Sequence, residues 1–319
     1  MDAEDPRAIG VDLGLSVTDA VAIDAAGGVL RHVAVPTRRL VPAEALRAAL
    51  EALAWGSTGD VAVAVTGGRS AAWSDDEAAA ALRSVWPAAR HGPLLVPEAE
   101  AIGRGGLRLA DREAALVVSC GTGTAMVAAR SAAGEHRHAS GTPVGGGTLR
   151  ALGALLLGSD DAEAIADLAE AGDAGAVDTT LADVLGTGLG TLPASATAVS
   201  LGRLSQLGAD APRREDLAAG LVTMVAQTIA LIALSTMRAA DLPVSVAVGR
   251  LAGLEPLRAM LAAVFEVYGV RPALLVPEGG ATATALGAAL ASLERTGAVG
   301  TDPDRATRPT MGHGHSRGS

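Results

Sequence analysis

Two short turns rich in glycine and hydroxyl residues are the parts of the sequence best suited to chemistry. The first lies in "GVDLGLSVT", after a buried apolar run that ends at Asp12, and the second in "SCGTGTAM", residues 119–126. Successive backbone N–H groups in such turns bind anions, and the missing Cβ of glycine lets a phosphate approach. Either turn alone is compatible with an ordinary hairpin. Their recurrence at matching places predicts two lobes that hold a chain of phosphates between them.

An acidic residue and a third glycine-rich run complete the candidate chemistry. Glu98 stands at the start of a predicted helix in "LLVPEAEAIG", where a carboxylate could accept the proton of an attacking hydroxyl. Acidic residues are also common there because the helix dipole favours them, so a purely structural role stays open for this position alone. The run "HASGTPVGGGTLRALGALLLG", residues 138–158, predicts a tight loop around a ligand and a helix that anchors it.

Composition excludes several other chemistries. The formal charge of −10 argues against nucleic acid and anionic membranes as partners. All 25 basic residues are arginine, which excludes a P-loop lysine, a Schiff-base lysine and the lysine of protein kinases. The single cysteine, Cys120, fits a reducing cytoplasm, and the acidic N-terminus does not have the pattern of a secretory signal. Small and polar residues interrupt the apolar segment 217–237, which is interpreted as a buried helix rather than a membrane span.

The two halves of the chain begin in the same way. Residues 8–35 and 114–140 each predict an apolar strand, a turn of glycine and hydroxyl residues, and two further strands. Strands that alternate with helices follow in both halves, which predicts an α/β protein with an internal duplication. We expect a first lobe over 1–112, a second lobe over 113–296, and a disordered tail over 297–319, where Gly, Pro, Arg and His predominate.

These pieces resemble the actin, hexokinase and heat-shock-chaperone ATPase superfamily, and within it the type II pantothenate kinases. The similarity runs from residue 9 to residue 290 and keeps the order of the family's motifs. They are "GVDLGLSVT", "VTGG" at 65–68, "PEAEAIGRGGLRL", "SCGTGTAM", "SGTPVGGGTLRALGALLLG", "AEAGDAGAVDTTLADVLG", "VGRLAG" and "EGGATATALGAAL". The resemblance implies a two-lobed actin-like ATPase (ribonuclease H-like) fold, with duplicated βββαβαβα-type halves around a nucleotide cleft.

The resemblance also implies a function. It is the ATP-dependent, Mg²⁺-assisted phosphorylation of pantothenate to 4′-phosphopantothenate, the first step of coenzyme A biosynthesis. A cytoplasmic homodimer that also binds acetyl-CoA or CoA is the expected assembly.

Particular residues acquire roles from the same resemblance. Glu98 is the expected catalytic base and Asp12 the expected Mg²⁺ ligand. The residues expected to bind ATP are Gly14, Ser16, Gly121, Thr122, Gly123, Thr124, Gly145, Gly146, Gly147, Gly249, Gly279 and Gly280. The residues expected to bind the acceptor are Arg137, His138, Ser140, Gly141 and Thr142.

Two departures from the family pattern leave alternatives open. Asp19 stands where the family has a phosphate-binding lysine, so an arginine or the metal must compensate its charge beside a triphosphate. His138 stands where the family has a substrate-binding arginine, and the adjacent Arg137 should face the opposite side of its strand. The alternatives are a same-fold kinase for another small alcohol, such as pantetheine or a sugar, and a catalytically weak regulatory protein that binds a nucleotide or acyl-CoA.

Overall fold

The structure, a computed structural model, describes residues 6–54, 61–71, 73–87, 89, 91–206, 211–268 and 274–296. The prediction of a disordered tail over 297–319 lies outside the described residues.

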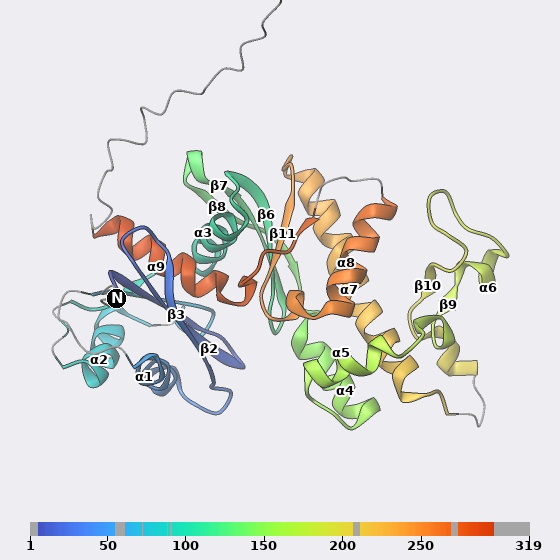
Figure 1. Cartoon of the computed structure of the whole chain (residues 1–319), viewed down its shortest axis with the longest axis horizontal. Coiled ribbons are helices and arrows are strands. Elements are labelled where there is room, and N and C mark those ends of the chain that lie inside the picture. Colours follow the sequence, from blue (N-terminus) through green and yellow to red (C-terminus); the bar gives the residue numbers. More distant parts are fainter. Residues whose placement is uncertain are drawn as a thin grey trace, which may run out of the picture.

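Two five-stranded sheets form the framework (Figure 1). The first sheet contains β1 (Ala8–Leu13), β2 (Val17–Ile23), β3 (Val29–Pro36), β4 (Ala62–Thr66) and β5 (Leu94–Leu95). The second contains β6 (Ala114–Cys120), β7 (Thr124–Arg130), β8 (Glu135–Thr142), β11 (Ser245–Val248) and β12 (Leu274–Leu275). A separate two-stranded sheet pairs β9 (Thr179–Thr180) with β10 (Thr197–Val199).

The two large sheets have the same topology. Their strand orders are β3-β2-β1-β4-β5 and β8-β7-β6-β11-β12. In each, the first three strands along the chain form an antiparallel meander, and the other two run parallel to the central strand. Thus β1 corresponds to β6, and β4 corresponds to β11. The internal duplication predicted from the two similar openings is confirmed.

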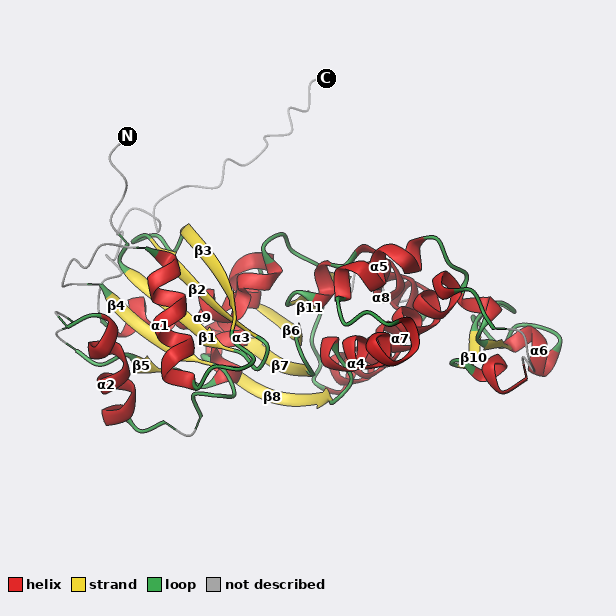
Figure 2. Ribbon diagram, turned by 90° about the horizontal axis from the view of Figure 1, so that it is seen from below, coloured by secondary structure: helices red, strands yellow, loops and turns green. Residues whose placement is uncertain are grey.

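Helices cover the outer face of each sheet. On the first sheet these are α1 (Pro42–Leu53) and α2 (Asp75–Val85). On the second sheet lies α7 (Arg214–Ala239), surrounded by α4 (Gly146–Leu157), α5 (Ala162–Glu170) and α8 (Glu255–Val267). The helix α6 (Leu181–Leu185) lies with β9 and β10 on a projection at the far end of the molecule (Figure 2). Short 3₁₀ helices span Ser131–Ala133, Ala174–Ala176, Gly202–Gln206, Leu251–Gly253 and Gly280–Thr282.

Two helices are exchanged between the sheets. The helix α3 (Glu98–Ala110) follows the last strand of the first sheet, yet its residues Ile102 and Leu107 pack on the second sheet. The helix α9 (Ala283–Arg295) follows the last strand of the second sheet, yet Leu286 and Leu293 pack on the first. Both lie between the two sheets, in contact with each other (Figure 2). Each packing unit therefore contains a helix from the other half of the chain, and lobes of 1–112 and 113–296 stay a prediction.

Glycines allow α3 and α9 to approach closely. A Cβ added to Gly105 would lie 1.7 Å from the backbone oxygen of Ala283, and one added to Gly287 would lie 1.8 Å from that of Ala101. A real Cβ cannot come this near to a backbone oxygen, so any side chain at either position must push the helices apart.

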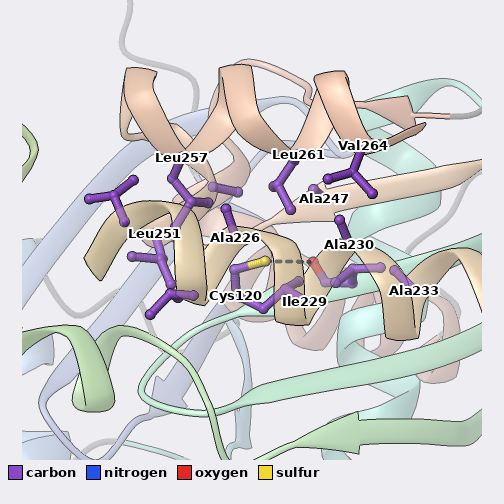
Figure 3. Packing of buried hydrophobic residues seen from close by; sticks show 14 of the residues in the cluster. Cys120, Ala226, Ile229, Ala230, Ala233, Ala247, Leu251, Leu257, Leu261 and Val264 are labelled. Atoms are coloured by element: carbon purple, nitrogen blue, oxygen red, sulfur yellow. Dashed lines mark hydrogen bonds between the residues drawn. The ribbon is translucent and has the colours of Figure 1, made fainter. Parts of the chain in front are cut away.

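The long apolar helix α7 is part of the core. By length and composition it could cross a membrane, but 67% of its most apolar stretch is buried inside the protein. Ala226, Ile229 and Ala230 of α7 pack with Leu261 of α8 and with Cys120 at the end of β6 (Figure 3). The interpretation of residues 217–237 as a buried helix is confirmed. Burial raises the pKa of the Cys120 thiol to about 12, so this cysteine is a small core residue and not a nucleophile.

We predict that Gly105→Ala lowers the free energy of unfolding by at least about 2 kcal/mol, because its Cβ overlaps the backbone of α9. Urea unfolding followed by circular dichroism measures the change. The control is Gly253→Ala, whose Cβ meets nothing within 4 Å and which should shift stability by less than about 0.5 kcal/mol. Equal effects of the two substitutions would contradict the close contact.

Candidate functional site

The two predicted phosphate loops lie side by side. The loop between β1 and β2 carries Ser16, and the equivalent loop between β6 and β7 carries Thr122. Their hydroxyl oxygens are 3.3 Å apart, within hydrogen-bond distance. Gly121, Thr122 and Gly123 are exposed at this point. Two turns from different sheets therefore present hydroxyl groups and backbone to the same place.

The glycine run 145–147 supports the second of these loops. Gly146 donates its N–H to the carbonyl of Gly121 at 2.8 Å, and Gly147 donates to that of Thr122 at 2.8 Å. A Cβ on Gly145 would lie 2.8 Å from the carbonyl oxygen of Thr122. The packing of α4 therefore requires glycine here even without a ligand, because a side chain would prevent the start of α4 from docking on the loop. Their predicted role in binding ATP stays a prediction.

A buried carboxylate beside the first loop is paired with an arginine from the other sheet. Asp19 on β2 lies opposite Asp12 on β1, and it is 3% exposed. Its Oδ1 accepts hydrogen bonds from Nε2 of His32 at 2.8 Å and from Nη2 of Arg250 at 2.5 Å. Arg250 follows β11 of the second sheet. The arginine that compensates the charge of Asp19 is therefore Arg250.

Asp12 lies at the carboxyl end of β1 among other acidic groups. Burial, together with the nearby charges of Asp19 and Glu98, raises its pKa to about 7, although Arg250 acts in the opposite direction. Gly67 has a φ of +96°, and a Cβ there would lie 2.4 Å from Oδ1 of Asp12. Only glycine combines this backbone conformation with so close an approach to the carboxylate.

A buried hydroxyl lies beside Asp12. Thr66 is opposite Asp12 in the pairing of β1 with β4. Its Oγ1 is buried and has no hydrogen-bond partner among the described residues. The end of β4 therefore offers a further oxygen next to the Asp12 carboxylate.

Glu98 is the first residue of α3 and faces the same glycine pair. Its Oε2 would lie 3.6 Å from a Cβ on Gly68. The surrounding protein raises the pKa of Glu98 by desolvation, and His138 lowers it. Its neighbour Glu100 is instead bound to Arg104 at 2.9 Å and to Arg295 at 3.0 Å. Of the two carboxylates at the start of α3, Glu98 is the one directed toward Asp12 and His138.

The five residues predicted to bind the acceptor do not all lie together. His138 is opposite Val127, on the face of the second sheet that α3 covers. Arg137 is opposite Ala128, on the other face, and pairs with Glu135 at 3.5 Å.

The other three acceptor residues have local partners. Ser140 is hydrogen-bonded to Thr236 of α7 at 2.7 Å. Thr142 accepts the N–H of Val144 at 3.1 Å, and a Cβ on Gly141 would lie 2.6 Å from the carbonyl oxygen of Thr124. Within the described part of the chain, His138 is thus the member of the five that acts on Glu98.

A pocket of about 240 Å³ lies between the segment after β11 and the segment before α9. Its lining includes Gly249, Arg250, Gly279 and Gly280. Gly249 donates its N–H to the carbonyl of Gly280 at 2.9 Å. The structure therefore brings together Gly249, Gly279 and Gly280, three of the glycines predicted to bind ATP.

Metal binding depends on few protein groups. In the described ranges, no cluster of three or more His, Cys, Asp or Glu residues has the geometry to hold a metal ion. Mg²⁺ commonly uses one or two carboxylates, together with substrate phosphates and water. Asp12, with the unpartnered Thr66 hydroxyl beside it, fits that kind of site.

Sequence reasoning did not assign Arg250, His32 or Thr66. The signal for Arg250 was the charge of Asp19, since a carboxylate beside a phosphate requires a cation. The chain has 25 arginines, and the partner lies 231 positions away. The sequence could therefore indicate the need for an arginine but not which one supplies it.

Comparison with known proteins confirms the predicted resemblance to the type II pantothenate kinases. Residues 113–251 match the Fumble family. Pantothenate kinase 1 of Oryza sativa subsp. japonica is 34% identical over 122 residues, which are 37% of this chain and 18% of that protein. The match thus spans less than a fifth of the length of this relative.

Solved structures confirm the two-lobed actin-like ATPase fold. The activator of the 2-hydroxyisocaproyl-CoA dehydratase from Clostridium difficile, with bound ADPNP, gives a TM-score of 0.62 at 16% identity and covers 96% of this chain and 99% of its own. A ROK family glucokinase from Streptomyces griseus, in complex with glucose and AMPPNP, gives a TM-score of 0.55 at 17% identity. The match covers 90% of this chain and 99% of the glucokinase chain. At these identities the two neighbours show the fold that this chain shares with them.

The raised pKa of Asp12 has a consequence for stability. Its folded value of about 7 lies above the ordinary 3.8, so the folded protein holds this proton more tightly than the unfolded chain does. The carboxyl therefore costs stability increasingly as the pH rises from about 4 to about 7, and fully above that. We predict that Asp12→Asn raises the free energy of unfolding by up to about 4 kcal/mol at pH 8 and gives no such gain at pH 4. Urea unfolding at the two pH values tests this, and an equal change at both would contradict it.

Proposed function

We propose that the protein is a kinase that transfers the γ-phosphoryl group of ATP to the hydroxyl of pantothenate, forming 4′-phosphopantothenate. The observation that carries the proposal is the contact between Ser16 and Thr122, which brings two phosphate-loop turns together beside Asp12 and Glu98. The similarity to the rice pantothenate kinase supports the acceptor. The ATP analogues in the two solved neighbours support the nucleotide.

In this proposal ATP extends from the pocket to the two loops. The adenosine occupies the pocket beside Gly249, Gly279 and Gly280. Backbone N–H groups and the hydroxyls of Ser16 and Thr122 bind the phosphates, as turns of this composition do. Asp12 in its ionised form would hold Mg²⁺, which would supply positive charge to neutralise the phosphates. Because the pKa of Asp12 is about 7, part of the population carries a protonated Asp12 at neutral pH in the protein without ligands.

Glu98 is the proposed general base. The acceptor oxygen attacks the γ-phosphorus, Glu98 takes the hydroxyl proton, and the bond to the β-phosphate oxygen breaks to release ADP. The raised pKa of Glu98 makes it a better proton acceptor than an ordinary carboxylate. His138 lies near enough to act on this charge, and we assign it to the acceptor side of the site.

Another small alcohol is the second candidate acceptor. Arg137 pairs with Glu135 on the opposite face of the sheet from His138, so the arginine available near the expected acceptor position is turned away from Glu98. In this arrangement Arg137 does not offer its guanidinium to the carboxylate of pantothenate. A cytoplasmic homodimer that also binds CoA thioesters is proposed on the family resemblance alone.

The acceptor is tested by ADP release with Mg-ATP and pantothenate, pantetheine or glucose, each at the same concentration. We expect turnover with pantothenate, since the family similarity favours it. Turnover with another alcohol alone would support the second candidate. Nucleotide binding without turnover on any acceptor would favour a regulatory protein.

The role of Glu98 is tested against its neighbour on the same helix. We predict that Glu98→Gln lowers kcat by about 10²-fold to 10⁴-fold, because the amide cannot accept the proton, and leaves the Kd for ATP unchanged. Glu100→Gln weakens the ion pairs to Arg104 and Arg295, so it should lower thermal stability and keep turnover. Steady-state kinetics and calorimetric titration with ATP measure both. Normal turnover in Glu98→Gln would remove this residue from the mechanism.

A further inference from the structure

We propose that Arg250 binds the phosphate chain of the nucleotide and that Asp19 holds it in position to do so. The two residues together would then replace the phosphate-binding lysine that the first loop does not have. This inference rests on the nucleotide site proposed above and goes beyond it by naming the cation that binds the phosphates.

Arg250 spans the distance between two parts of the proposed site. It lines the pocket assigned to the adenosine. Its Nη2 lies 2.5 Å from Oδ1 of Asp19, which is opposite Asp12 in the pairing of β1 with β2. The guanidinium therefore lies between the adenosine pocket and the carboxylate assigned to Mg²⁺. A chain of phosphates that connects the two must pass beside it.

The guanidinium has donors to offer in this position. Asp19 is almost fully buried, with a side chain 4% exposed, whereas the side chain of Arg250 is 43% exposed. An arginine carries five N–H donors in a planar fork, so it can bind a carboxylate along one edge and phosphate oxygens along another. The exposed remainder of Arg250 is thus suited to bind an anion while Asp19 retains its Nη2.

Asp19 is held rigidly enough to orient the arginine. It lies inside β2, and the oxygen that binds Arg250 also accepts a hydrogen bond from His32 at 2.8 Å. Asp12, Asp19 and Glu98 together place several negative charges where a triphosphate would lie. Arg250 acts against them, since its charge lowers the pKa of Asp12. Asp19 is a positioning residue in this scheme, because it acts through Arg250 and not on the nucleotide.

The role of Arg250 is tested by calorimetric titration of the full chain with ATP, ADP and adenosine. Arg250→Gln should weaken ATP and ADP binding by about tenfold to a hundredfold, which is the usual effect of losing a charge-assisted hydrogen bond. Adenosine binding should weaken much less than ATP binding, because Arg250 lines the adenosine pocket but adenosine has no phosphate for the guanidinium to bind. Arg250→Lys should fall between the two, since it keeps the charge and loses the fork. An equal loss for ATP and adenosine, or no loss for either, would overturn the assignment.

The role of Asp19 is tested by whether Asp19→Asn weakens or tightens ATP binding. If Asp19 only adds negative charge, Asp19→Asn should tighten ATP binding. If it positions Arg250, Asp19→Asn should weaken ATP binding several-fold in the native background and cause no weakening in Arg250→Gln. Tighter ATP binding by Asp19→Asn in both backgrounds would overturn the positioning role.

An exposed ion pair between the halves, away from the pocket, supplies the control. Nη1 of Arg38 lies 3.8 Å from Oδ2 of Asp160, and Arg38 is not among the residues that line the pocket. Arg38→Gln should leave ATP binding unchanged. A loss as large as that of Arg250→Gln would show that any contact across the two halves has this effect, which would overturn the inference. Thermal unfolding of each variant without nucleotide checks that it folds.

The two proposals fail in different ways. If the unmodified protein does not bind ATP, the proposed function and this inference both fall. If it binds ATP and Arg250→Gln binds ATP equally well, the kinase proposal stands and the assignment of Arg250 is wrong.

Discussion

The close contact of α3 with α9 fixes the geometry on which the rest of the structure depends. These helices lie between the two sheets, and glycines at the contact bring backbone against backbone. The contact therefore sets the separation of the sheets and leaves little freedom to change it. The loops after β1 and β6 meet, at Ser16 and Thr122, because their sheets are held at that separation. A change of a few tenths of a nanometre between the sheets would part the loops.

Electrostatic balance is the second constraint on the site. The end of the first sheet concentrates carboxylates, and burial makes each charge more expensive than it would be in water. The raised pKa of Asp12 reflects the energetic cost of ionising this buried carboxyl near other negative charges. Arg250 relieves part of it, and it comes from the other sheet, so the balance of charge is complete only when both halves are in place. Phosphate binding would add further negative charge and make the cation more important.

The sequence predicts the duplicated sheets and the positions of the loops. It does not predict which contacts individual residues make in the folded chain. The two similar openings predict the duplicated sheets because the alternation of apolar runs and turns depends on local chemistry. The sequence predicts that the glycines at 145–147 bind ATP, whereas the structure shows that they let α4 dock on the second loop. That contact, like the pair of Asp19 with Arg250, joins segments that only the folded chain brings together. The exchange of α3 and α9 also depends on packing between the halves and leaves no local pattern.

This exchange bears on how the chain folds during its synthesis. The inner face of the first sheet, with Val21 and Ile23, is covered by α9, which is made some 260 residues later. Until those residues leave the ribosome, an apolar surface of the nascent protein stays open to water and to other chains. A first half made without α9 would lack Leu286 and Leu293, which pack on this face.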